Sequence, residues 1–282
     1  MPCMSTNRPA YLVFDIETAI DGRLLQRVRY PGEPDLSPAA TVARHRAELL
    51  AATGSDFIPA TFALPVSVGI AKVGRDLALI DLVSLDRPAF RPQVITRLFW
   101  DGWLHYGQPT FVSFNGRCFD LPVMELAAFR YGISLPQWFD TSGPGYKHPR
   151  NRYNQALHLD LQEVLTNFGT MRLNGGLDLL ATILGKPGKM DTKGYMVQDL
   201  WEAGEGLRID DYCLCDVLDT YFVFLRTRLL QGLLDVERER ALVEQARSLI
   251  EAKAVDNEHL RGYLERFALW QPYGDDDPPF VR

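Results

Sequence analysis

The stretch YLVFDIETAI at residues 11–20 constrains the fold of this chain more than any other segment. Tyr11 to Phe14 favour a β-strand, and they run directly into two acidic residues, Asp15 and Glu17. Side chains along a strand repeat every two residues, so both carboxylates project from one face and repel each other. A divalent cation removes this conflict, because Mg²⁺ and Mn²⁺ prefer hard oxygen ligands. The alternative is a solvated strand end, since short acidic patterns are common.

Composition narrows the class of protein. The 282 residues are 46% apolar and 23% charged, as in an ordinary globular protein. This length suits one large α/β domain, or a domain with a helical extension. The net charge is −6, which excludes a generally basic surface. Any contact with nucleic acid must therefore be local or mediated by metal ions.

Cysteine usage and the first residues indicate the compartment. The four cysteines lack the spacing of a zinc site or of a disulfide scaffold, which favours reduced thiols in a cytosol. The start, MPCMSTNRPA, has no apolar core of a signal peptide, and no apolar run approaches 18 residues. We therefore expect a cytoplasmic protein with no membrane contact.

Strand and helix patterns alternate along the chain, which predicts a mixed-sheet α/β domain. Ser37-Pro38 predicts a helix start, Gly74 predicts a hairpin turn, and Asp120 is expected to cap a helix. The polar stretch 21–37 carries no predicted element, and 156–165 is ambiguous between strand and helix. The predicted strands are 11–14, 64–74, 77–85 and 109–115, and the predicted helices are 37–52, 92–104, 120–131, 175–185, 209–230 and most of the tail after 230.

Two further acidic residues, Asp120 and Asp216, lie on predicted helices. Asp120 comes after a strand and at the start of a helix, where an Asp is often only an N-cap. Tyr212 precedes Asp216 by four residues on a helix, so the phenol and the carboxylate share a face. Taken alone, such a pair is more often a surface hydrogen bond.

Together these segments resemble the DEDD 3′–5′ exonucleases, whose fold is RNase H-like. The family has three motifs. In this sequence Asp15 and Glu17 match the first motif, D-x-E, and Asn115, Phe119 and Asp120 match the second, N-x-x-x-F/Y-D. Tyr212 and Asp216 match the third, Y-x-x-x-D, and its Tyr places the likeness in the DEDDy branch.

The likeness is nearest to the predicted bacterial 3′–5′ exonucleases related to the proofreading domain of family B DNA polymerases, and it runs from about Tyr11 to Leu230. Segments such as SFNGRCFDLPVMELAA and YCLCDVLDTYFVFLR carry it. It implies an RNase H-like fold with a mixed central sheet flanked by helices. We expect the exonuclease domain at residues 8–232 and a helical C-terminal extension at 233–282.

The resemblance also implies a mechanism with two divalent metal ions, Mg²⁺ or Mn²⁺, about 4 Å apart. Asp15 would bridge both ions, and Glu17 and Asp216 would complete the site that generates hydroxide. Asp120 would help to hold the second ion, through water. Tyr212 would aim the attacking water, which is a positioning role.

Substrate contacts are expected outside the carboxylates. Phe119 and Asn115 are expected to bind the substrate, although Asn115 is expected to set the turn before Asp120 more than to contact the nucleic acid. The basic loop at 186–194, with Lys186, Lys189 and Lys193, is expected to contact phosphates of a single strand. A second cluster of basic and aromatic residues at 146–153 either does the same or is merely solvated. Asp160 is either a supporting residue or a helix cap.

The sequence thus predicts a 3′–5′ exonuclease that degrades single-stranded DNA, or frayed 3′ ends, to 5′-mononucleotides. The alternatives are an exoribonuclease of the same fold and a catalytically inactive nucleic-acid-binding module. The inactive module would be expected to lack at least one carboxylate, and none is missing. No polymerase region follows in this sequence, so a polymerase or repair partner is expected in trans.

Overall fold

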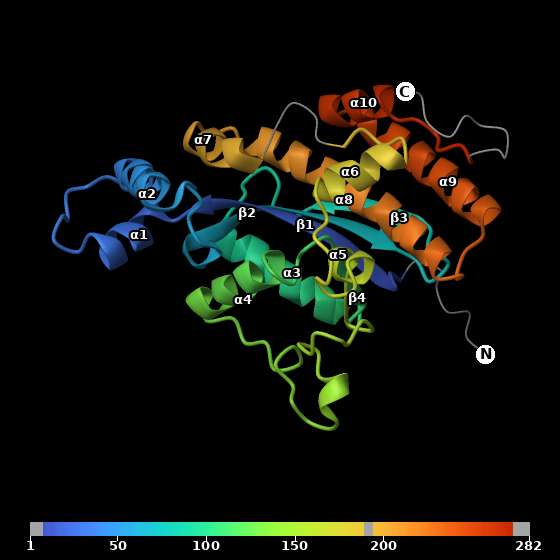
Figure 1. Cartoon of the computed structure of the whole chain (residues 1–282), viewed down its shortest axis with the longest axis horizontal. Coiled ribbons are helices and arrows are strands. Elements are labelled where there is room, and N and C mark those ends of the chain that lie inside the picture. Colours follow the sequence, from blue (N-terminus) through green and yellow to red (C-terminus); the bar gives the residue numbers. More distant parts are fainter. Residues whose placement is uncertain (1–7, 189–193, 273–282) are drawn as a thin grey trace.

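The computed structural model describes residues 8–188 and 194–272 (Figure 1). Its five strands form one mixed sheet in the order β3-β2-β1-β4-β5. The central strand, β1, pairs antiparallel with β2 and parallel with β4. The strands are β1 (Tyr11–Ile20), β2 (Ala63–Val73), β3 (Leu79–Ser84), β4 (Thr110–Ser113) and β5 (His158–Asp160). This mixed sheet flanked by helices confirms the predicted RNase H-like α/β fold.

Helices cover both faces of the sheet. Helix α8 crosses one face, with α9 and α10 outside it, and α3 and α4 cover the other face (Figure 1). The α-helices are α1 (Gly22–Arg29), α2 (Pro38–Thr53), α3 (Pro92–His105), α4 (Asp120–Tyr131), α5 (Leu161–Leu165), α6 (Gly176–Ile183), α7 (Val197–Glu202), α8 (Gly206–Leu230), α9 (Val236–Ala254) and α10 (Glu258–Glu265). The short 3₁₀ turns are η1 (Ala60–Phe62), η2 (Gly145–Lys147) and η3 (Gly194–Met196).

Alternation along β1 divides the core in two. Leu12 and Phe14 point to the face covered by α3, where they pack with Phe99 and neighbouring aromatic rings. Val13 points to the opposite face and packs with Val217 of α8. Because the side-chain period of a strand is two, Asp15 continues the face of Val13 and is directed toward α8.

Most predicted elements are confirmed, and the differences have local causes. Ser37 caps α2 by accepting a hydrogen bond from the backbone N of Ala40, and the hairpin of β2 and β3 forms as expected. The stretch 21–37 contains α1, which the sequence reading missed because a single large apolar side chain of that helix, Leu25, is buried. The ambiguous segment 156–165 holds both β5 and α5. Asp120 is the first residue of α4 and not its cap, which is Phe119.

The C-terminal segment is helical, as predicted, and it shares the main core. Leu242 and Ile250 of α9 and Leu260 and Tyr263 of α10 pack in the same cluster as α8. The boundary at 232 therefore stays a prediction, because the two segments have no separate cores. Within the described residues, no helix combines the length and apolarity needed to cross a membrane.

Candidate active site

Three carboxylates from two distant parts of the chain meet between β1 and α8. Asp15 and Glu17 lie on β1 and Asp216 lies on α8, and each offers an oxygen within 4.8 Å of the others. The alternation of β1 directs both acids toward α8, and the helical position of Asp216 brings it to them. The first and third motifs led us to expect that these three carboxylates would converge.

A glycine on the neighbouring strand allows this close approach. Gly69 of β2 lies opposite Asp15 in the antiparallel pair. A Cβ built at Gly69 would lie 2.9 Å from Cγ2 of Val217 and 3.4 Å from Sγ of Cys213, both on α8. The missing side chain therefore lets α8 pack closely against the sheet where Asp216 must reach Asp15.

Cys213 is a site neighbour that the sequence reading did not single out. Its Sγ donates to the backbone O of Asp15 at 3.3 Å and lies 3.9 Å from Oδ2 of the same residue. Burial raises the pKa of this thiol well above its usual value, so the thiol stays protonated and acts as a donor. The i, i+3 spacing of Cys213 and Asp216 on one helix face was the available signal.

The fourth acid, Asp120, lies beside the trio. The backbone N of Ile16 donates to Oδ1 of Asp120 at 3.2 Å, which ties the start of α4 to β1 between the two acids of the first motif. Burial raises the pKa of Asp120 to about 7. The charge of Asp120 in turn contributes to a raised pKa at Asp15, so the four acids form one electrostatic unit.

The electrostatics of this unit suit a cation. Burial is the largest cause of the raised pKa of Asp15, followed by the charges of Asp120, Glu17 and Asp216. Buried carboxylates that repel one another are stabilised by a bound divalent ion, and their oxygens are the ligand type of Mg²⁺ and Mn²⁺. The residues present therefore fit such ions.

Tyr212 lies on the same helix, one turn before Asp216. Burial raises the pKa of its phenol, and the charges of Asp216 and Glu17 raise it further. Tyr212 is therefore protonated at neutral pH, and its hydroxyl can donate a hydrogen bond but cannot serve as a base.

The loop that delivers Asp120 is held by Asp160. The two oxygens of Asp160 accept from the backbone N of Asn115 at 3.0 Å and of Arg117 at 2.9 Å, and the same carboxylate caps α5. Asn115 has a φ of 63° and accepts a side-chain hydrogen bond from Gln162. In this structure Asn115 forms the turn, and Asp160 is both a cap and the support of that turn.

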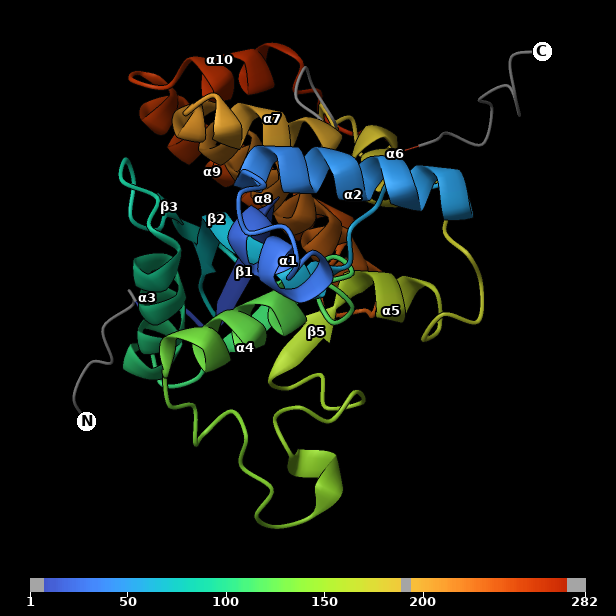
Figure 2. The same cartoon turned by 90° about the vertical axis from the view of Figure 1, so that its left-hand side faces the viewer.

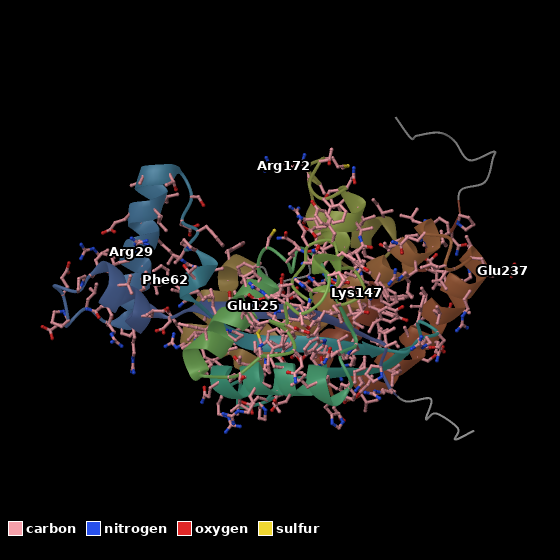
Figure 3. The ribbon with its side chains drawn as sticks, turned by 90° about the horizontal axis from the view of Figure 1, so that it is seen from below. Arg29, Phe62, Glu125, Lys147, Arg172 and Glu237 are labelled. Carbon is pink, nitrogen blue, oxygen red and sulfur yellow. The ribbon has the colours of Figure 1, made fainter. Side chains whose placement is uncertain are left out.

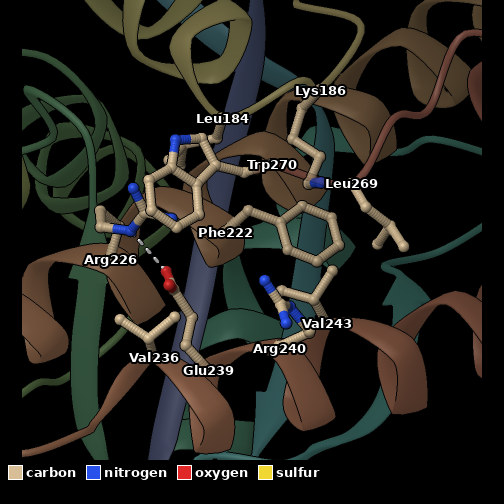
Figure 4. Close-up of a pocket in the computed structure, with 10 residues that line it drawn as sticks. All are labelled: Leu184, Lys186, Phe222, Arg226, Val236, Glu239, Arg240, Val243, Leu269 and Trp270. Carbon is tan, nitrogen blue, oxygen red and sulfur yellow. Dashed lines mark hydrogen bonds and ion pairs between the residues drawn. The ribbon is translucent and has the colours of Figure 1, made fainter. Parts of the chain in front are cut away.

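Lys186 does not lie where a phosphate contact requires. Its side chain is buried, its Nζ donates to the backbone O of Ala268 at 2.7 Å, and it lies 3.8 Å from the ring centre of Phe267. Figure 4 shows it in a pocket with Phe222 and Trp270. The structure corrects the expectation of a phosphate contact from Lys186, because the ammonium is enclosed by the C-terminal segment. Lys189 and Lys193 lie outside the described residues.

The arginines of the second basic cluster, at residues 146–153, form ion pairs within the protein. Arg150 pairs with Glu125 at 2.9 Å, and Arg152 pairs with Glu163 at 2.7 Å. The rings of Tyr146 and Tyr153 are exposed. Of the two readings, the ion pairs favour a structural role for the arginines.

Three comparisons with known proteins bear on this arrangement. A family model described as "Predicted 3'-5' exonuclease related to the exonuclease domain of PolB" matches residues 55–267, a range that begins after β1. A DNA polymerase of Pyrococcus glycovorans is 30% identical over 118 residues, which cover 39% of this chain and 15% of the polymerase. The family B DNA polymerase of Pyrobaculum calidifontis is similar with a TM-score of 0.48 and 15% identity, over 86% of this chain and 29% of that structure. The chain thus spans a minor part of the length of both polymerases.

Proposed function

The chain belongs to the predicted 3′–5′ exonucleases related to the exonuclease domain of PolB, and from this premise we propose that it removes nucleotides one by one from the 3′ end of single-stranded DNA. The reaction is metal-dependent hydrolysis of the terminal phosphodiester, and the products are 5′-mononucleotides. The substrate has a free 3′ end, as a single strand or as the frayed end of a duplex.

The convergence of Asp15, Glu17 and Asp216 carries this proposal. Asp15 and Glu17 lie far from Asp216 in the chain, and no packing requirement explains three carboxylate oxygens within 4.8 Å of one another between β1 and α8. An inactive binding module would not need them, and their mutual repulsion would destabilise it.

Each side chain has a role that follows from its position. Asp15, Glu17 and Asp216 would hold the divalent ions, with Asp120 beside them. Bound ions of this kind supply a water of lowered pKa and neutralise charge on the phosphoryl and leaving oxygens. Tyr212 is protonated and its hydroxyl hydrogen-bonds to Asp216. We assign to this hydroxyl the role of orienting the attacking water beside Asp216. Cys213 fixes the backbone of Asp15.

This arrangement is compatible with a net charge of −6. The scissile phosphate would meet cations held by the carboxylates, so the surrounding surface need not be basic. The enclosed Lys186 and the paired Arg150 and Arg152 agree with such a local arrangement.

The test uses oligonucleotides labelled at the 5′ end, incubated with Mg²⁺ or Mn²⁺. We expect a ladder that shortens from the 3′ end, release of 5′-mononucleotides, and no reaction in EDTA. Cleavage of a circular single strand, or activity that persists in chelator, would contradict the proposal. Matched DNA and RNA strands distinguish the deoxyribonuclease from an exoribonuclease of the same fold, and single and double strands show which form is preferred.

A further inference from the structure

A buried acid near the start of α8, Asp210, belongs to none of the three motifs. Its side chain is fully enclosed, where a carboxylate is tolerated only if donors satisfy it. Its Oδ1 accepts from the hydroxyl of Ser67 on β2 at 2.7 Å and from the hydroxyl of Ser84 on β3. Its Oδ2 accepts from Nη1 of Arg87 at 2.6 Å. Donors from two strands and one loop therefore converge on a single side chain of α8.

The same nitrogen of Arg87 also binds the next acid along the helix. Nη1 donates to Oδ1 of Asp211 at 2.8 Å. Helix α10 reaches Asp211 as well, since Nδ2 of Asn257 donates to Oδ1 at 2.7 Å and Nδ1 of His259 lies 3.1 Å from Oδ2. Figure 2 shows α10 on the face of the sheet away from α3. Arg87 thus links the sheet, α8 and α10 through two consecutive carboxylates.

The loop that carries Arg87 is itself held in place. Oδ2 of Asp86 accepts from the backbone N of Arg91 at 2.8 Å, and the guanidinium of Arg91 pairs with the same carboxylate. Phe90 is buried against the start of α8, where a Cβ built at Gly206 would lie 2.8 Å from its ring. The guanidinium of Arg87 therefore reaches α8 from a fixed support.

This network meets the sheet beside the candidate active site. Ser67 lies opposite Glu17 in the antiparallel pair of β1 and β2, and the register of the pair shifts at the next residue, Thr18. Because paired residues share a face of the sheet, Ser67 is directed toward α8 as Glu17 is. On the helix, Asp210 precedes Tyr212 by two residues. The hydrogen bond between Ser67 and Asp210 therefore joins the two elements that carry the site.

Two contacts with β2 define how α8 lies on the sheet. One is the apolar contact of Val217 at Gly69, and the other is the polar contact of Asp210 with Ser67. The two contacts are roughly 10 Å apart along the helix axis. Apolar packing tolerates small rotations of a helix, whereas hydrogen bonds weaken steeply when their angles change. The polar contact therefore selects the rotation of α8 at which the third motif faces β1.

We propose that Arg87 is a positioning residue of the candidate active site. By bridging Asp210 and Asp211, it holds α8 at the rotation that brings Tyr212 and Asp216 to the acids of β1. The role is exerted through the helix and not by contact with substrate. The inference rests on the proposed function for its effect on hydrolysis, whereas its effect on metal affinity requires no nucleic acid.

The test compares Arg87→Met with the wild-type protein. Methionine keeps an unbranched apolar stem and removes both contacts with α8. We expect Mn²⁺ affinity, measured by calorimetric titration, to fall roughly 10-fold, because a small displacement of one ligand weakens the whole set. On oligo-dT, kcat should fall by roughly 10-fold or more while KM changes little. Circular dichroism and urea denaturation give the folded fraction, to which both measurements are normalised.

Three further variants separate positioning from general stability. Nη1 of Arg87 alone makes both contacts, so the single ammonium of Arg87→Lys can replace it and should recover most of the loss. Ser67→Ala removes the donor on the sheet and should change Mn²⁺ affinity in the same direction, by a smaller factor. Arg29→Met alters an exposed arginine of α1 at one end of the molecule and should behave like the wild type (Figure 3).

A folded Arg87→Met with wild-type Mn²⁺ affinity and kcat would overturn the inference, whatever stability it has lost. Should Arg87→Met not fold, unchanged Mn²⁺ affinity in Ser67→Ala would overturn it equally. Weaker Mn²⁺ binding by Arg87→Met, in a protein whose wild type hydrolyses no DNA, would sink the proposed activity and leave the positioning of the carboxylates standing. Equal hydrolysis by wild type and Arg87→Met would leave the activity standing and remove the inference.

Discussion

Tyr212 and Asp216 lie one turn apart on α8 but should respond differently to substitution. Asp216→Ala removes a carboxylate of the trio, so affinity for Mn²⁺ and hydrolysis should be lost together. Tyr212→Phe removes only the hydroxyl, so metal binding should persist while kcat falls roughly 10²-fold, the size of one positioned transition-state contact. Calorimetric titration with Mn²⁺ and steady-state kinetics measure the two effects. Wild-type turnover by Tyr212→Phe would mean that this tyrosine is only a core residue.

We expect the free energy of unfolding to depend on pH through Lys186, because burial lowers its pKa from 10.5 to about 8. Between pH 8 and 10.5 the folded protein loses this proton while the unfolded chain keeps it. The free energy of unfolding should therefore rise with pH in this window, by roughly 3 kcal/mol at most.

The measurement is urea denaturation at pH 8 and pH 10. Lys186→Met keeps the apolar stem and should lack this rise, whereas Lys147→Met, at an exposed position, should follow the wild-type protein. Parallel curves for Lys186→Met and wild type would show that the ammonium is not enclosed.

At the scale of elements, the contact of α8 with the sheet depends on Gly69. Gly69→Ala places a methyl group 2.9 Å from Val217 and must push α8 outward. We expect a loss of about 1–3 kcal/mol in stability, together with weaker metal binding as Asp216 moves away from β1. Thermal melts and Mn²⁺ titration measure both.

Gly102→Ala is the matched control for this change. Gly102 lies inside α3 with open space where its Cβ would be. Alanine should stabilise this helix by about 0.5–1 kcal/mol. Equal effects at the two glycines would mean that the close approach of α8 is not required.

At the scale of the whole molecule, α9 and α10 complete the core over α8. Tyr263 of α10 donates to Oδ1 of the buried Asp219 at 2.6 Å, and both residues are enclosed. Removing residues 233–282 would expose this core. A fragment of residues 8–232 is expected to lose its cooperative thermal transition in circular dichroism. A fragment that melts cooperatively and still hydrolyses DNA would instead support a domain boundary at 232.

Tyr263→Phe tests the same contact without a truncation. The change keeps the ring and removes one buried hydrogen bond, so the expected cost is about 1–3 kcal/mol. Urea denaturation at pH 7 measures it. A variant as stable as the wild type would show that α10 is held by apolar packing alone.

The sequence by itself determined most of the strand and helix order, without α1, β5, α5 and α7, and it singled out the acids of the candidate site. Alternation along β1 and the i, i+4 spacing on α8 are local periodicities, so Asp15, Glu17, Tyr212 and Asp216 could be assigned to faces before any tertiary contact was known. Resemblance added the expectation that these faces meet, since no local rule joins residue 17 to residue 216.

Only the tertiary structure decided which basic and aromatic side chains are available to a ligand. Lys186 looked like part of an exposed basic loop, but the C-terminal segment covers it. Burial and ion pairing depend on segments distant in the chain, whereas strand and helix periodicity depends on the nearest few residues. For that reason the carboxylates could be predicted from the sequence, and the walls of the site could not.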